Sequence, residues 1–130
     1  MMMVKKLFKY LLGLFFLLAG FNHFLDPESY FPLIPDYIPF PKLINIVSGL
    51  LEIIFGAGMF FKKYSKTAAW GIVVLMFLFI PAHIYFIQIG SCVEGGLCVP
   101  PWMAWIRLLL IQPILIYWAY IFTKNKRYGK

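Results

Sequence analysis

Four long apolar stretches alternate with short polar segments along this chain of 130 residues. A helix needs about 20 mostly apolar residues to cross the roughly 30 Å of hydrocarbon in a bilayer. Each stretch reaches that length, so the pattern predicts transmembrane helices at residues 7–25, 42–61, 67–89 and 101–123. We therefore expect an all-α membrane protein in which residues 1–130 form a single bundle of four transmembrane helices.

The charged side chains are sorted between the gaps that separate these stretches. Basic residues gather at the two termini and in the middle gap: Lys5, Lys6, Lys9, Lys62, Lys63, Lys66, Lys124, Lys126, Arg127 and Lys130. Four of the five acids, Asp26, Glu28, Asp36 and Glu94, lie in the first and third gaps, where Lys42 is the only base. Since Lys and Arg collect on the cytoplasmic side, both termini are predicted to be cytoplasmic. A cleaved signal peptide is the alternative for the first stretch, but no small-residue cleavage site precedes Asn22.

Composition supports a membrane location. The hydrophobic fraction is 62% and the mean hydropathy is +0.83, which is more apolar surface than a soluble domain of this length can bury. The formal charge of +7 would suggest nucleic acid as the partner of a soluble protein. Here the bases flank membrane spans, so anionic lipid headgroups are the expected partner and nucleic acid is not.

The two outer gaps have distinct chemistry. Five prolines lie between Asp26 and Pro41, among aromatic side chains, so this segment is predicted to form a semi-rigid flap in the outer headgroup region. The third gap holds both cysteines, Cys92 and Cys98, on the predicted oxidising side, and Gly95–Gly96 allows a tight reversal between them. A structural disulfide is the favoured interpretation, and two free thiols are the alternative. The spacing does not favour a catalytic dithiol, and no Cys/His cluster predicts a metal site.

Ionisable or strongly polar residues inside a membrane span are functional candidates by default. Six residues of this kind within the predicted spans are singled out: His23, Asn45, Glu52, His83, Arg107 and Gln112. At 1.5 Å per residue, Asn45 and Glu52 lie about 6 Å and 16 Å in from Pro41, and His83 lies about 9 Å below Ile89. Arg107 and Gln112 lie about 9 Å and 16 Å below Pro101, and His23 is near the outer end of its stretch. All six therefore occupy the predicted outer half of the bilayer.

Helical phase brings several of these residues to common faces. Asn45, Gly49, Glu52 and Gly56 form one narrow stripe, and Phe16, Ala19, Gly20 and His23 share a face of the first stretch. The glycines allow another helix to approach closely.

A buried carboxylate needs a partner and an Arg stays charged, so we expect a Glu52–Arg107 ion pair inside the bundle. Such a pair could simply lock two helices together. It could also form, with His23 and His83, a polar pocket that binds a ligand.

The sequence resembles the short DoxX-like membrane proteins of bacteria across all four stretches. The segments that carry the resemblance are AGFNHFLDPESYFPLIPDYIPFP (19–41), SGLLEIIFGAGMF (48–60), AAWGIVVLMFLFIPAHIY (68–85) and RLLLIQPILIYWAY (107–120). The family's G-x-x-H-F, P-x-Y-x-P and S-G-x-x-E elements match here, as do its Arg and Gln at Arg107 and Gln112. Two departures are His83, where the family usually has Asn, and the displacement of Gln112 by one position.

The resemblance implies a multi-pass protein of the bacterial plasma membrane, similar to small subunits linked to quinone-coupled sulfur oxidation and oxidative-stress complexes. The leading hypothesis is a non-enzymatic accessory protein that binds a lipophilic small molecule, a quinone or a lipid, at His23, Asn45, Glu52, His83, Arg107 and Gln112. The alternatives are a membrane enzyme that uses Glu52 and His23 as acid and base, and a chaperone or assembly partner of another membrane protein. No cofactor motif is present, and homo-oligomerisation is left open.

Overall fold

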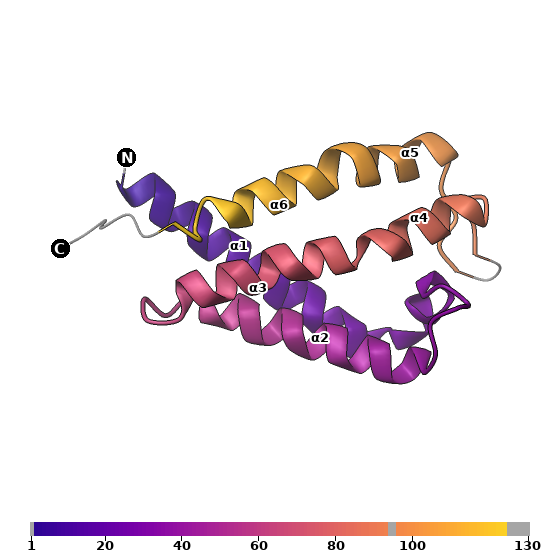
Figure 1. The fold of residues 1–130 in the computed structure, drawn as a ribbon, viewed down its shortest axis with the longest axis horizontal. Helices are drawn as coiled ribbons and strands as arrows, with labels where there is room; N and C mark the ends of the chain where they lie inside the picture. The colour runs from indigo at the N-terminus through magenta and orange to yellow at the C-terminus, as the bar shows by residue number, and fades with distance from the viewer. Residues whose placement is uncertain (1, 94–95, 125–130) are drawn as a thin grey trace.

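A computed structural model describes residues 2–93 and 96–124 of the chain, and within these residues the fold is all-helical. The helices in chain order are α1 (Met2–Leu25), η1 (Pro27–Ser29), η2 (Phe31–Leu33), α2 (Pro41–Gly58), α3 (Ser65–Leu78), α4 (Ile80–Gln88), α5 (Pro101–Ile106), η3 (Arg107–Ile111) and α6 (Gln112–Tyr120). Figure 1 shows the start of α1, the end of α6 and the α2–α3 turn at one end of the molecule, which we call the terminal end. The segments that precede α2 and α5 lie at the opposite end, which we call the flap end. Five residues used in the charge and turn arguments, Glu94, Gly95, Lys126, Arg127 and Lys130, lie outside the described residues.

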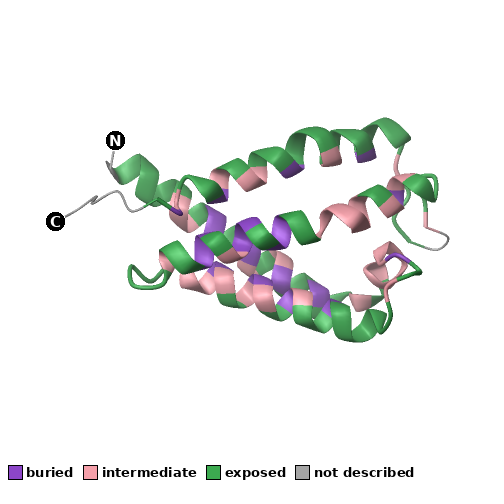
Figure 2. Ribbon diagram, in the orientation of Figure 1, coloured by how far each residue is buried: buried purple, intermediate pink, exposed green. Residues whose placement is uncertain are grey.

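Three helical stretches of the described chain are long and apolar enough to cross a membrane: Pro41–Gly58, Ser65–Gln88 and Pro101–Tyr120. Their outward faces carry large apolar side chains, such as Ile54 at 57% exposed and Leu109 at 67%. Figure 2 shows these exposed faces in green on the outside of the helices. Because a large continuous apolar exterior is not stable in water, the exterior of this bundle is suited to lipid.

The first two long helices run antiparallel and meet through glycines. A Cβ atom added to Gly20 would lie 2.7 Å from the Gly49 carbonyl oxygen, and one added to Gly56 would lie 2.8 Å from the Gly13 carbonyl oxygen. Such distances leave no room for a side chain, so the two backbones touch directly. The glycine stripe predicted on α2 is confirmed, because Asn45, Gly49, Glu52 and Gly56 are the residues that α2 buries.

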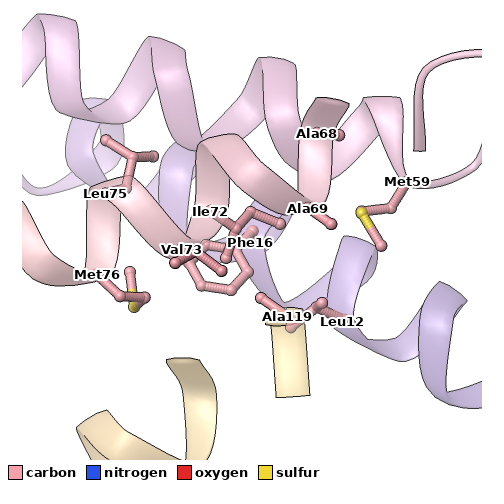
Figure 3. Close-up of a cluster of buried hydrophobic side chains, with 10 residues drawn as sticks. All are labelled: Leu12, Phe16, Met59, Ala68, Ala69, Ile72, Val73, Leu75, Met76 and Ala119. Carbon is pink, nitrogen blue, oxygen red and sulfur yellow. The ribbon is translucent and has the colours of Figure 1, made fainter. Parts of the chain in front are cut away.

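The apolar core lies in the half of the bundle nearer the terminal end. Figure 3 shows this cluster, which α3 dominates and to which α1, the end of α2 and α6 contribute. Its members are Leu12, Phe16, Met59, Ala68, Ala69, Ile72, Val73, Leu75, Met76 and Ala119. The Trp118 indole N–H also donates to the Phe8 carbonyl oxygen over 3.2 Å, which ties α6 to α1 at this end.

Two of the predicted continuous helices are interrupted near their middle. The stretch expected at residues 67–89 is divided at Phe79 into α3 and α4, because Pro81 supplies no N–H to continue the ladder. The stretch expected at residues 101–123 contains a π-helical segment, η3, directly before Pro113. Such π segments commonly mark functional regions of helices.

The flap, residues 26–40, and the 89–100 loop cover the flap end. The flap contains two short 3-10 turns, η1 and η2, and no longer helix, as its prolines predict. Asp36 of the flap interacts with the Tyr85 hydroxyl of α4. A disulfide joins Cys92 to Cys98 in the adjacent loop, and the Val99 N–H donates to the Ser91 carbonyl oxygen over 3.0 Å. The disulfide and this hydrogen bond close the 89–100 loop on itself.

Candidate functional site

A cavity of about 690 Å³ lies in the half of the bundle nearer the flap end. Residues of α1, α2, α3, α4, η3 and α6 line it, together with residues of the flap and Leu97 of the disulfide loop. The six polar residues singled out from the sequence all line it: His23, Asn45, Glu52, His83, Arg107 and Gln112. The rest of the wall is mainly aliphatic and aromatic. The fold thus gathers residues from four separate segments around one space.

One wall holds a hydrogen-bonded cluster between α1 and α2. The Asn45 side chain makes two contacts with His23: its Nδ2 donates to the His23 carbonyl oxygen over 2.9 Å, and its Oδ1 lies 2.7 Å from His23 Nδ1. The opposite ring nitrogen, Nε2, lies 3.2 Å from Glu52 Oε2. All three residues are buried. The direct backbone contact at Gly20 and Gly49 is what brings these side chains within reach of one another.

The Asn45 contacts determine where the His23 ring carries its protons. A backbone carbonyl only accepts, so the Asn45 group that faces it must be the NH₂, and its Oδ1 must face Nδ1. Because Oδ1 also only accepts, Nδ1 must carry a hydrogen. Nε2 and Oε2 would then oppose each other as two lone pairs unless a proton lies on one of them. A proton on either atom would turn this contact into a hydrogen bond.

Glu52 Oε2 lies close to His23 Nε2 but does not form a well-directed hydrogen bond with it. The 3.2 Å separation satisfies an ion-pair distance, but Oε2 is buried and has no aligned hydrogen-bond donor among the described residues. An oxygen in this state retains unused capacity for hydrogen bonding.

The flap closes over this cluster through Tyr30. Its ring stacks on the His23 imidazole with 3.9 Å between centroids and 20° between planes. The Asn22 amide donates to the Tyr30 hydroxyl over 2.6 Å. Tyr30 thus covers one face of the imidazole and lines the cavity at the same time.

The opposite wall brings together residues of α4, η3 and α6. Arg107 lies close enough to His83 to act on its charge, and the Gln112 side chain interacts with the His83 ring. Gln112 Nε2 also donates to the Met76 carbonyl oxygen over 2.6 Å. That carbonyl precedes the break at Phe79 and Pro81, so Gln112 satisfies a backbone group near the interruption.

The prediction of a Glu52–Arg107 ion pair is wrong. The carboxyl group of Glu52 contacts His23 instead, and no carboxylate within the described ranges pairs with Arg107. The physical reason is packing: α1 and α2 are in backbone contact, whereas Arg107 lies on η3, which contacts α4 and its own neighbours α5 and α6. Sequence depth placed both groups in the outer half of the bilayer but could not show which helices are neighbours.

Sequence reasoning missed Tyr30, which the flap positions directly against His23. It also missed Ser48, which lines the cavity one turn before Glu52. Aromatic side chains among the flap prolines were the available signal for Tyr30, but they were interpreted as membrane-interface anchors. Within the described residues, no three His, Cys, Asp or Glu side chains form a group suited to a metal ion.

Comparisons with known proteins give one positive result. No curated protein and no solved structure matches the chain. A family model described as a domain of unknown function, DUF8561, matches residues 12–123, which include every residue of the two polar walls. Because this match covers most of the sequence, the chain belongs to the DUF8561 family.

Proposed function

We propose that this chain is an integral membrane protein with four spanning segments and both termini in the cytoplasm. Its three long apolar helices support a membrane location, and α1 packs along α2 over direct glycine contacts. The bases at the terminal end and the acids at the flap end support the orientation. The resemblance to DoxX-like proteins supports the bacterial plasma membrane.

We propose further that the cavity binds a lipophilic small molecule with a polar head, a quinone or a lipid, as an accessory protein linked to redox chemistry. The cavity itself carries this proposal. Its volume, about 690 Å³, is within the usual range for small-molecule sites, roughly 300–1,000 Å³. Apolar walls with a few convergent polar groups are also the usual lining of such sites.

The depth of the cavity within the bundle suits a ligand that enters from the bilayer. On one wall the carboxyl group of Glu52 can accept a hydrogen bond from a headgroup. On the other wall Arg107 can donate hydrogen bonds, and the ring of His83 can donate or accept. The aliphatic lining accommodates the apolar remainder of the molecule. Asn45 and Gln112 already use their amide N–H groups on the carbonyls of His23 and Met76, so they position the site.

A plugged cavity tests this function. Ala82 lines the cavity, so Ala82→Phe fills part of it and leaves the six polar residues unchanged. Val74→Phe is the matched control, because Val74 is 54% exposed on the outer face of α3. We expect lipophilic molecules retained by the purified protein, and thermal stabilisation by an added short-chain quinone or phospholipid, to be lost only in Ala82→Phe. The proposal fails if the wild-type protein neither retains nor is stabilised by any lipophile.

One observation favours a second function, acid–base catalysis on a lipid or quinone headgroup. His23 Nε2 and Glu52 Oε2 are 3.2 Å apart, which is within reach for proton exchange. Incubation of the protein with the lipophiles it retains, followed by mass spectrometry, tests this function. Conversion of a bound lipophile that is lost in Glu52→Gln and kept in Glu28→Gln would favour catalysis, and recovery of every lipophile unchanged would exclude it for those compounds.

A further inference from the structure

We infer that the ligand of this cavity is an anionic amphiphile, whose carboxylate or phosphate group pairs with Arg107. The inference rests on the proposed function and adds to it the charge of the ligand. It follows from the charges that line the cavity and from the partner that Glu52 actually has.

Four residues with ionisable charge line the cavity: His23, Glu52, His83 and Arg107. Glu52 faces His23 across the α1–α2 interface, with Oε2 3.2 Å from His23 Nε2. No ion pair joins its carboxyl group to Arg107 among the described residues. Glu52 is therefore not paired with the charge on the other wall.

Arg107 brings an unpaired positive charge to the cavity wall. Its guanidinium stays protonated under all ordinary conditions, and none of the described carboxylates is paired with it. His83 can be neutral or positive and contributes no negative charge. Asp36 of the flap interacts with Tyr85 and is not part of the cavity wall. Arg107 lines the cavity and is also exposed at the surface of the bundle, among apolar side chains. A positive charge in such apolar surroundings favours an anion as its partner.

The donors beside Arg107 fit an oxygen-rich anion. A guanidinium presents five N–H donors in a planar fork that matches a carboxylate or phosphate group with two parallel hydrogen bonds. His83 also lines the cavity and can donate a ring N–H. Most of the remaining cavity lining is apolar and includes Leu75, Phe79 and Ile111. This arrangement fits a headgroup at Arg107 and an alkyl chain within the bundle.

The test compares ligands that differ only in head charge. Dodecanoate, dodecyl phosphate and dodecanol share one chain, and their affinities are measured on the full protein in a neutral detergent at alkaline pH. A charge-assisted hydrogen-bonded pair predicts that at least one anion binds about tenfold or more tightly than dodecanol. Preference for the phosphate points to a phospholipid, and preference for the carboxylate points to a fatty acid. Either preference supports the inference.

Three variants assign that preference to Arg107. Arg107→Gln should reduce anion affinity about tenfold and leave dodecanol affinity unchanged, and Arg107→Lys should recover part of the loss because the charge returns. Lys42→Gln removes the same charge from an exposed residue outside the cavity wall and should behave like the wild type. Equal affinity for dodecanol and both anions in the wild type would overturn the inference and leave the proposed function standing. Absence of binding by all three would overturn both.

Discussion

The imidazole of His23 and the carboxyl group of Glu52 meet across the α1–α2 interface, with Nε2 and Oε2 3.2 Å apart. Asn45 holds the other side of the ring and fixes its tautomer. This pairing takes the place of the expected Glu52–Arg107 bridge and puts a polar contact inside the α1–α2 interface.

The first prediction is energetic coupling between these two side chains. Glu52→Gln and His23→Gln should each lower the free energy of unfolding, and the double variant should lose less than the sum. We expect a coupling energy of about 1–3 kcal/mol, because contacting residues in one hydrogen-bonded network are not additive. Reversible unfolding in mixed micelles measures it.

A control double-mutant cycle uses an exposed glutamate, Glu28, in place of Glu52. Glu28 lies in the flap outside the cavity wall, so Glu28→Gln and His23→Gln should be additive. Additive effects in the Glu52 cycle as well would mean that the pair contributes no interaction energy.

The second prediction concerns the α1–α2 contact. A Cβ atom at Gly49 would lie 2.8 Å from the Cβ of His23, so Gly49→Ala must push the helices apart. We expect a loss of about 1–3 kcal/mol in unfolding free energy, as for other overpacked sites. Gly96→Ala is the control, since its Cβ would meet only the Val93 side chain and backbone, at 3.2 Å or more. Equal stability of the two variants would show that close helix contact is not required.

The third prediction assigns Gln112 a structural role. Gln112→Leu removes the hydrogen bond to the Met76 carbonyl oxygen and leaves that acceptor without its side-chain donor near the α3–α4 break. We expect a cost of about 1 kcal/mol, measured by the same unfolding assay. Gln88→Leu, at an exposed position at the end of α4, should cost less. The reverse order would contradict the role of Gln112 at the break.

The fourth prediction concerns orientation. In a Cys92→Ser/Cys98→Ser background, a cysteine introduced at Glu28 should react with a membrane-impermeant maleimide added to intact cells. A cysteine introduced at Ser65, in the turn with Lys62, Lys63 and Lys66, should react only after the cells are permeabilised. The opposite labelling pattern would invert the proposed topology.

Much of the fold follows from the sequence because a bilayer imposes a length and a polarity on each helix. The buried stripe of α2 was predicted from phase alone, since Asn45, Gly49, Glu52 and Gly56 repeat at helical spacing. The interruption at Phe79 and the π segment at Arg107–Ile111 were not predicted. Both depend on how neighbouring helices satisfy freed backbone groups, as Gln112 does for Met76.

The sequence predicts which polar residues line the candidate site but not which of them contact one another. Depth placed the six polar residues in one half of the bundle, and all six line one cavity. The partner of Glu52 can be identified only when it is known that α1 packs directly against α2. That packing depends on the close backbone contact between Gly20 and Gly49. The stacking of Tyr30 on His23 depends on the path of the flap, and proline content alone does not determine that path.

Photo-crosslinking tests the central claim, a ligand inside the bundle, most directly. A fatty acid with a diazirine near the end of its chain is added to membranes that contain the protein, and the labelled peptides are mapped by mass spectrometry. We predict competition-sensitive labelling of cavity residues on α3 and α4, such as Leu75 and Ala82, that is lost in Ala82→Phe. Labelling confined to outward-facing residues such as Ile54 and Leu109, unchanged by unlabelled competitor, would contradict the account.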